Sequence, residues 1–220
     1  SRFLYSILVA SDFYATNEFM NNIKFTDFGE ILYIDGFDDI YKKTKINVGI
    51  REYEKIFYGK YNDFKKVSDM NILRNEMFLD AEKEYDLNKQ ENIFFLEAPT
   101  GSGQSNVAMN LSFKALKDNI DLNKIFYIYP YNTLVEQNLK SLKEVFDGHE
   151  EIFNKIAVIN SIYPIKMDFV EMIKDKNEEY TEYYNKAFLN RQFLNYPIIL
   201  TTHVSIFDTM FNNSKESILA

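Results

Sequence analysis

The ten residues from Glu97 to Asn106 constrain the fold more than any other part of this chain. They read Glu-Ala-Pro-Thr-Gly-Ser-Gly-Gln-Ser-Asn, and they lie between an apolar run at 93–96 and a predicted helix at 106–117. Two glycines at this spacing, between a strand and a helix, are typical of a loop that holds phosphate with backbone N–H groups and a helix N-terminus. The residues of this candidate phosphate loop are Thr100, Gly101, Ser102, Gly103, Gln104 and Ser105.

The loop lacks the lysine that such loops use to reach the β- and γ-phosphates. Gln104 stands at that position and is neutral, so the cation that stabilises charge on a transferred phosphoryl group is missing. Ser105 keeps a hydroxyl suited to Mg²⁺, but the sequence contains no Asp-Glu-x-His or Asp-Glu-x-Gln box to hold the ion. We therefore expect no enzymatic activity, no catalytic residue and no cofactor, with weak residual nucleotide binding as the alternative.

From residue 93 onward, predicted strands alternate with predicted helices. The strands are expected at 93–97, 124–129, 156–159 and 197–201, and the helices at 106–117, 133–147, 167–195 and 204–212. A helix start near Thr133 is expected after the second strand, and a capped helix is expected after the fourth. Apolar strands separated by helices predict an α/β fold whose mainly parallel sheet is covered by helices on both faces.

The first 69 residues are predicted to be helical or irregular. Residues 1–22 form one apolar helix, and residues 23–69 form an irregular connector with short strands, such as 31–34, and a helix at 52–58. An amphipathic helix follows at 71–85, with Asp69 or Asn71 as its N-cap. Its apolar side is predicted to consist of Ile72, Met77, Phe78 and Ala81.

Composition excludes several classes of function. The 220 residues include no cysteine, which rules out disulfides and thiolate metal sites, and no apolar stretch approaches the roughly 18–20 residues of a membrane span. His149 and His203, the only histidines, have no second ligand at a metal-binding spacing, so we expect no metal site. The net charge of −8 disfavours direct nucleic-acid binding and favours a basic protein partner. A soluble cytoplasmic protein is expected.

Four segments together resemble a known family. They are Asn71-Ile72-Leu73-Arg74-Asn75-Glu76, Phe95 to Gly103, Phe126 to Gln137 and Ile198 to Asp208, and their order and spacing are similar to those of the CRISPR-associated helicase–nuclease of type I systems. The resemblance implies that residues 70–220 form part of a RecA-like helicase domain. Residues 5–12 are similar to the last helix of that family's HD nuclease domain, which makes residues 1–22 a remnant of it and Asp12 an isolated metal-ligand aspartate.

The departures from that family suggest a binding function. Gln104 replaces the lysine, Asn106 replaces an acidic residue, and neither the Asp-Glu box nor a second RecA-like domain is present. The chain is similar in this respect to helicase-like anti-CRISPR proteins, including inhibitors of type VI systems. We expect a natural short protein of a bacterial or phage-infected cell that inhibits an RNA-guided CRISPR effector protein or ribonucleoprotein, through contact residues that the sequence does not identify. The alternatives are a fragment of an ATP-dependent helicase acting with a partner chain, and a degraded-gene product without a role.

Overall fold

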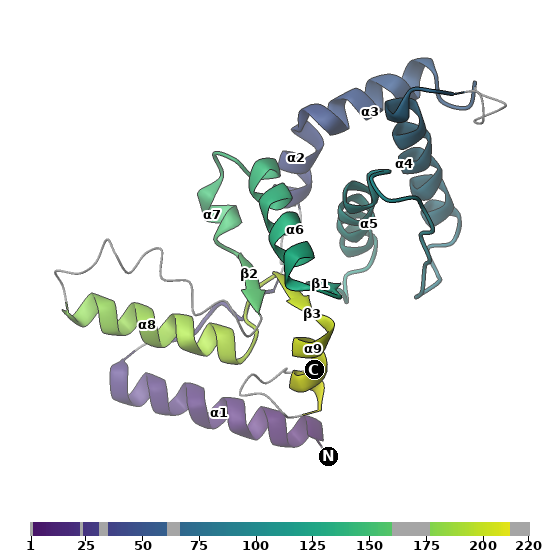
Figure 1. Cartoon of the computed structure of the whole chain (residues 1–220). Helices are drawn as coiled ribbons and strands as arrows, with labels where there is room; N and C mark the ends of the chain where they lie inside the picture. The colour runs from purple at the N-terminus through teal and green to yellow at the C-terminus, as the bar shows by residue number, and fades with distance from the viewer. Residues whose placement is uncertain (1, 23, 31–34, 61–66, 160–176, 212–220) are drawn as a thin grey trace. The chain divides into compact units, whose positions relative to one another are not determined.

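The chain folds into two compact units, each with its own core, and Figure 1 draws their helices and strands. The computed structural model describes residues 2–22, 24–30, 35–60, 67–159 and 177–211. One unit, here called the sheet unit, consists of Ser1–Ile31 and Lys124–Ala220, and the other, the loop unit, is Leu32–Asn123. The expected strand at 31–34 and residues 167–176 of the expected helix at 167–195 lie outside the described residues.

The sheet unit contains a three-stranded parallel sheet among its described residues. Its elements are helix α1 (Arg2–Asn21), β1 (Ile125–Tyr129), α6 (Asn132–Val145), α7 (Glu150–Phe153), β2 (Ile156–Ile159), α8 (Asn177–Gln192), β3 (Ile198–Thr202) and α9 (His203–Met210). The strand order is β1-β3-β2, and Ile125 and Ile156 both lie opposite Ile198 in the register. The expected α/β class and three of its four strands are confirmed, each strand to within one residue.

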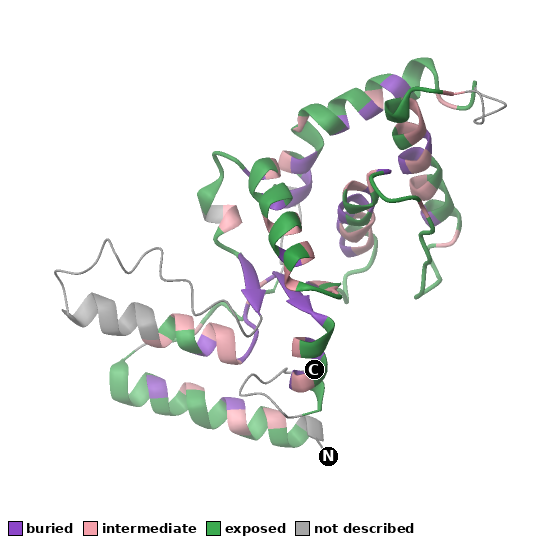
Figure 2. Cartoon of the chain, viewed as in Figure 1, coloured by how far each residue is buried: buried purple, intermediate pink, exposed green. Residues whose placement is uncertain are grey.

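Strand β3 forms the centre of the sheet, and its first three residues are apolar. All five of its residues are buried, Ile198 and Leu200 completely, as expected of a parallel strand covered on both faces. Figure 2 shows β2 and β3 in the colour of buried residues. Helix α6 packs against β1 and β3 and contributes the buried Val135 and Leu142 to this core.

Helix α1 packs against the segment that leads from α8 to β3. Ala10 of α1 joins Leu189 and Phe193 in a buried cluster, and the ring of Tyr14 lies 5.1 Å from that of Phe193. The Asn195 side-chain amide donates a hydrogen bond of 2.6 Å to the Tyr14 hydroxyl. The predicted N-terminal helix at 2–21 is thus present and is part of the hydrophobic core of the sheet unit.

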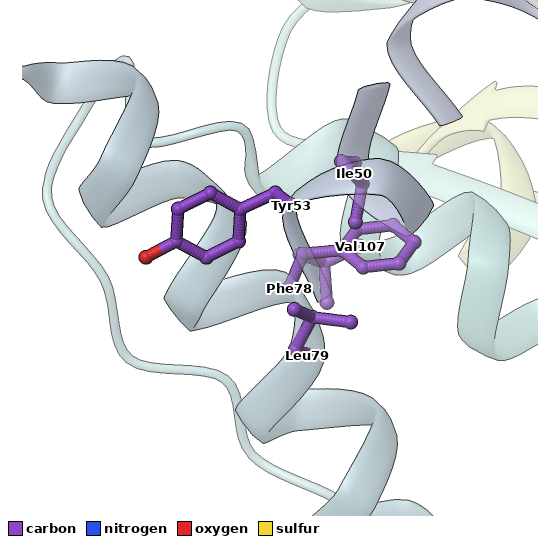
Figure 3. Close-up of a cluster of buried hydrophobic side chains, with 5 residues drawn as sticks. All are labelled: Ile50, Tyr53, Phe78, Leu79 and Val107. Carbon is purple, nitrogen blue, oxygen red and sulfur yellow. The ribbon is translucent and has the colours of Figure 1, made fainter. Parts of the chain in front are cut away.

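Four helices make up the described regular structure of the loop unit. They are α2 (Asp35–Lys43), α3 (Lys45–Ile56), α4 (Met70–Leu87) and α5 (Gln104–Asp118). Figure 3 shows where α3, α4 and α5 meet, in a cluster of buried side chains contributed by Ile50, Tyr53, Phe78, Leu79 and Val107. The Tyr53 hydroxyl donates to a carboxylate oxygen of Glu76 at 2.6 Å, which satisfies both polar groups inside this core.

Helix α4 confirms the amphipathic helix expected at 71–85. Phe78 is buried, while Ile72, Met77 and Ala81 pack against the same cluster. Of the two expected caps, Asp69 is the N-cap, and its carboxylate accepts the Asn71 N–H. The connector at 23–69 contains α2 as well as a helix around 52–58, which extends back to Lys45 because Thr44 caps its start by accepting the Asn47 N–H.

Two expectations about local structure are wrong. Residues 93–97 form no strand: they have no regular secondary structure and pair with no strand within the described residues, and Phe95 is 94% exposed. A strand exists only where a neighbouring strand accepts and donates its backbone hydrogen bonds, and the described part of the loop unit is helical. Helix α6 begins at Asn132 with Tyr131 as N-cap, without a side-chain cap from Thr133. None of the helices in the described ranges has the length and hydropathy needed to cross a membrane.

Candidate phosphate-binding loop

The candidate loop ends where helix α5 begins, and Gly103 makes the turn between them. Gly103 is the N-cap of α5 with φ of +93°, a left-handed conformation that glycine adopts without steric cost. Its carbonyl accepts hydrogen bonds from the N–H groups of Asn106 and Val107 at 3.0 and 3.2 Å. The N–H groups that a helix start leaves available to an anion are therefore those of the residues before Asn106.

Gln104 uses its side chain inside the loop. Its amide nitrogen donates a hydrogen bond of 2.5 Å to the carbonyl of Ala98, six residues earlier. A second bond within the loop, from the Ser102 N–H to the Pro99 carbonyl at 3.2 Å, closes a turn between them. The residue at the lysine position therefore closes the loop and adds no charge to it.

Arg74 brings a positive charge to the loop from helix α4. Its Nε and Nη2 donate to the carbonyl of Gly101 at 3.1 and 2.8 Å, and its Nη1 donates to the Asn71 side chain at 3.2 Å. Arg74 is not among the loop residues that the sequence predicts, although it lies in one of the segments that carry the resemblance. The contact links residues 27 positions apart, so no local pattern could have indicated it.

A buried tyrosine of α2 holds the end of the loop in place. The Tyr41 hydroxyl donates to the carbonyl and to the side-chain oxygen of Asn106, at 2.9 and 2.8 Å, and only 1% of Tyr41 is exposed. The Tyr41 ring packs edge-on against Phe113 of α5, with centroids 5.4 Å apart. Asn106 is therefore a structural residue that fixes the first turn of α5.

The remaining loop residues differ in exposure. Thr100, Gly101 and Ser105 are exposed, whereas Ser102 is 8% exposed. The Ser102 hydroxyl is buried and has no hydrogen-bond partner among the described residues. Ser105, whose hydroxyl would suit Mg²⁺ although no metal site is expected, is exposed at the start of α5.

A second charged cluster supports the packing of α4 on α5. Glu82 accepts two hydrogen bonds from Arg51, at 2.6 and 2.8 Å, and one from Asn110 at 3.2 Å, while Lys114 lies 3.4 Å away. Burial would raise the pKa of Glu82, but the hydrogen bonds from Arg51 and Asn110 and the nearby positive charges outweigh it and lower the pKa to about 2. Glu82 is therefore ionised at neutral pH, and its role is structural.

The other residues singled out in the sequence do not gather at this loop. Asp12 lies on α1, His149 is the N-cap of α7, and His203 begins α9, all in the sheet unit. Among the residues that the structure describes, no three His, Cys, Asp or Glu side chains form a group able to hold a metal ion. The site thus consists of a glycine turn, a helix N-terminus and one arginine, which suit an anion.

A parallel sheet with intervening helices, together with a glycine loop that opens a helix, defines an α/β domain of the P-loop, RecA-like class. The sequence profile of the DEAD/DEAH box helicase family matches residues 83–219, more than half of the chain, and the chain belongs to that family. No curated protein and no solved structure matches it.

Proposed function

We propose that this chain is a non-enzymatic protein, built on a helicase-like scaffold, that binds an RNA-guided CRISPR effector and inhibits it. The observation that carries the proposal is the state of Gln104, which is neutral and hydrogen-bonded to the loop's own Ala98 carbonyl. A phosphate loop without its lysine lacks the electrostatic stabilisation on which phosphoryl transfer depends. A helicase-like scaffold without this stabilisation is suited to binding a partner.

Charge and sequence order support the choice of target. The net charge of −8 favours a basic partner surface, and effectors that hold a guide RNA present such surfaces to its phosphates. The order of segments between Asn71 and Asp208, which resembles that of CRISPR-associated helicases, supports an origin within the same systems.

The test is a reconstituted inhibition assay. Purified type I and type VI effector complexes are mixed with the chain, and target cleavage and complex formation by size-exclusion chromatography are measured. We expect a stable complex and protection of the target with one effector, and the same inhibition by Gln104→Lys, because the loop is not a catalytic centre. Absence of both binding and protection across the effectors of the host would contradict the proposal.

Arg74 motivates a second candidate, a helicase fragment that hydrolyses ATP only with a partner chain. Its guanidinium lies beside the loop at the Gly101 carbonyl and would place a cation near bound phosphate. This candidate predicts ATP hydrolysis by the unmodified chain once the partner is added, abolished by Arg74→Gln. The inhibitor proposal predicts no ATP hydrolysis by the unmodified chain or by Arg74→Gln, with or without the partner.

A further inference from the structure

A groove runs along helix α4 on the surface of the loop unit. Leu73, Met77 and Ala81 line it from α4, at the four-residue spacing that places side chains on one face of a helix. Leu111 of α5 and the segment 94–97 form the other walls, and the volume of the groove is about 550 Å³. Its floor is therefore apolar over about two turns of α4.

Carboxylates are the only charged groups that line this groove among the described residues. They are Glu76, Asp80, Glu84 and Glu97. The Tyr58 hydroxyl donates to Asp80 at 2.8 Å, and burial together with this carboxylate raises the pKa of Tyr58 to about 12, so the hydroxyl stays protonated at neutral pH. The hydrogen bond holds the Asp80 side chain in place and leaves its negative charge facing the groove.

The wall formed by residues 94–97 exposes apolar surface that the described structure does not cover. Phe95 is 94% exposed and Leu96 is 41% exposed. Contiguous exposed apolar side chains rimmed by polar groups are characteristic of protein interaction sites. A nucleic acid fits this surface poorly, because the three exposed carboxylates, Asp80, Glu84 and Glu97, would repel its phosphates, whereas Glu76 is buried against Tyr53.

We infer that this groove is a docking site for an amphipathic helix of a protein partner, with an apolar face flanked by lysine or arginine. The lining from Leu73 to Tyr85 extends for about 18 Å at 1.5 Å per residue, which suits about three turns of a bound helix. Charge complementarity selects a basic helix over an acidic one. That the partner is a protein rests on the proposed function. The groove adds the place where this partner binds.

The direct test uses the full chain and a designed probe. The probe is an 18-residue fluorescent peptide with a leucine stripe at helical spacing and lysines beside it; the matched control carries glutamate in place of lysine. We expect the lysine peptide to bind, with affinity falling as salt is raised, and the glutamate peptide to bind at least about tenfold more weakly. Hydrogen exchange should show protection of residues 73–85 and 94–97 on binding.

Matched variants separate the groove from general charge effects. Asp80→Asn with Glu84→Gln should weaken lysine-peptide binding by about three- to tenfold, whereas Glu91→Gln with Asp121→Asn removes the same charge from exposed positions outside the groove and should leave it unchanged. Phe95→Asp should weaken binding, and Ile120→Asp, at a side chain 96% exposed outside the groove, should not. If the double variant loses its fold, the exposed Glu84→Gln alone replaces it.

Three results would overturn the inference: equal binding of both peptides, equal effects of groove and control variants, or a free chain that already protects residues 94–97 by its own packing or by dimerisation. The proposed function is tested separately, by competition. If an effector binds the chain and the lysine peptide does not displace it, the groove is not the docking site, but the proposed function stands. If the lysine peptide binds at the groove but no effector binds the chain, the proposed function is wrong, but the groove is still a docking site.

Discussion

At the scale of single residues, Gln104 gives the clearest experiment on the loop. Its hydrogen bond to the Ala98 carbonyl closes the segment that precedes α5. Removing a hydrogen bond of this kind costs about 0.5–1.5 kcal/mol, so Gln104→Ala should speed amide exchange at residues 100–103 by up to about tenfold. Ser105→Ala, a change at the neighbouring exposed residue, is the control and should leave exchange unaltered. Equal exchange in wild type and Gln104→Ala would show that the bond does not hold the loop.

Glu82 gives a prediction about pH. Its pKa is lowered from an ordinary value of 4.5 to about 2, so its stabilising contribution is fully present above pH 4.5 and is lost as pH falls toward 2. Glu82→Gln should therefore lower the free energy of unfolding by roughly 1–3 kcal/mol at pH 7, and by progressively less between pH 4.5 and pH 2. Urea unfolding at several pH values measures this. Glu91→Gln should show no such dependence, and a constant difference for Glu82→Gln would contradict the assignment.

At the scale of elements, Gly29 joins the segment after α1 to the turn before β3. Its φ is +71°, and a Cβ at this position would lie 2.1 Å from the Asn195 carbonyl carbon. Gly29→Ala should destabilise the sheet unit by at least about 2 kcal/mol, since backbone atoms cannot move aside cheaply. Gly49→Ala, inside α3 and with nothing within 4 Å of the added carbon, should be neutral or stabilising by up to about 1 kcal/mol. Hydrogen exchange within each unit distinguishes these outcomes.

The elements that sequence predicts well are those whose signal is local. Helix α4 has an apolar face and an aspartate cap directly before it, and β2 is a short apolar run, so the predicted range matches β2 and lies within two residues of each end of α4. Residues 93–97 have the composition of a strand, but strand formation depends on a pairing partner that composition does not encode. For the same reason the glycine spacing located the loop, whereas the contact of Arg74 with Gly101 depends on how α4 packs.

At the scale of the whole molecule, net charge opposes the association that an exposed apolar segment promotes. The chain carries a net charge of −8, while the side chains of Ile93 and Phe95 are 73% and 94% exposed. Raising the salt concentration from about 0.05 M to about 1 M shortens the Debye length about fourfold and so weakens the repulsion between chains. Self-association, measured by sedimentation velocity, should therefore increase. Phe95→Asp should suppress this increase, and Ile120→Asp should not. Identical association by all three proteins would place the contact elsewhere.

The packing of α1 determines which truncated fragments of this chain can keep the core of the sheet unit covered. Tyr14 and Phe13 lie against Phe193, with ring centroids 5.1 and 5.8 Å away, and Ala10 is buried in the same cluster. A recombinant fragment that begins at residue 70, which the helicase resemblance invites, would leave Phe193 and Leu189 facing solvent beside the sheet. Expression trials should therefore keep the first thirty residues, and an affinity tag belongs on a flexible spacer ahead of them.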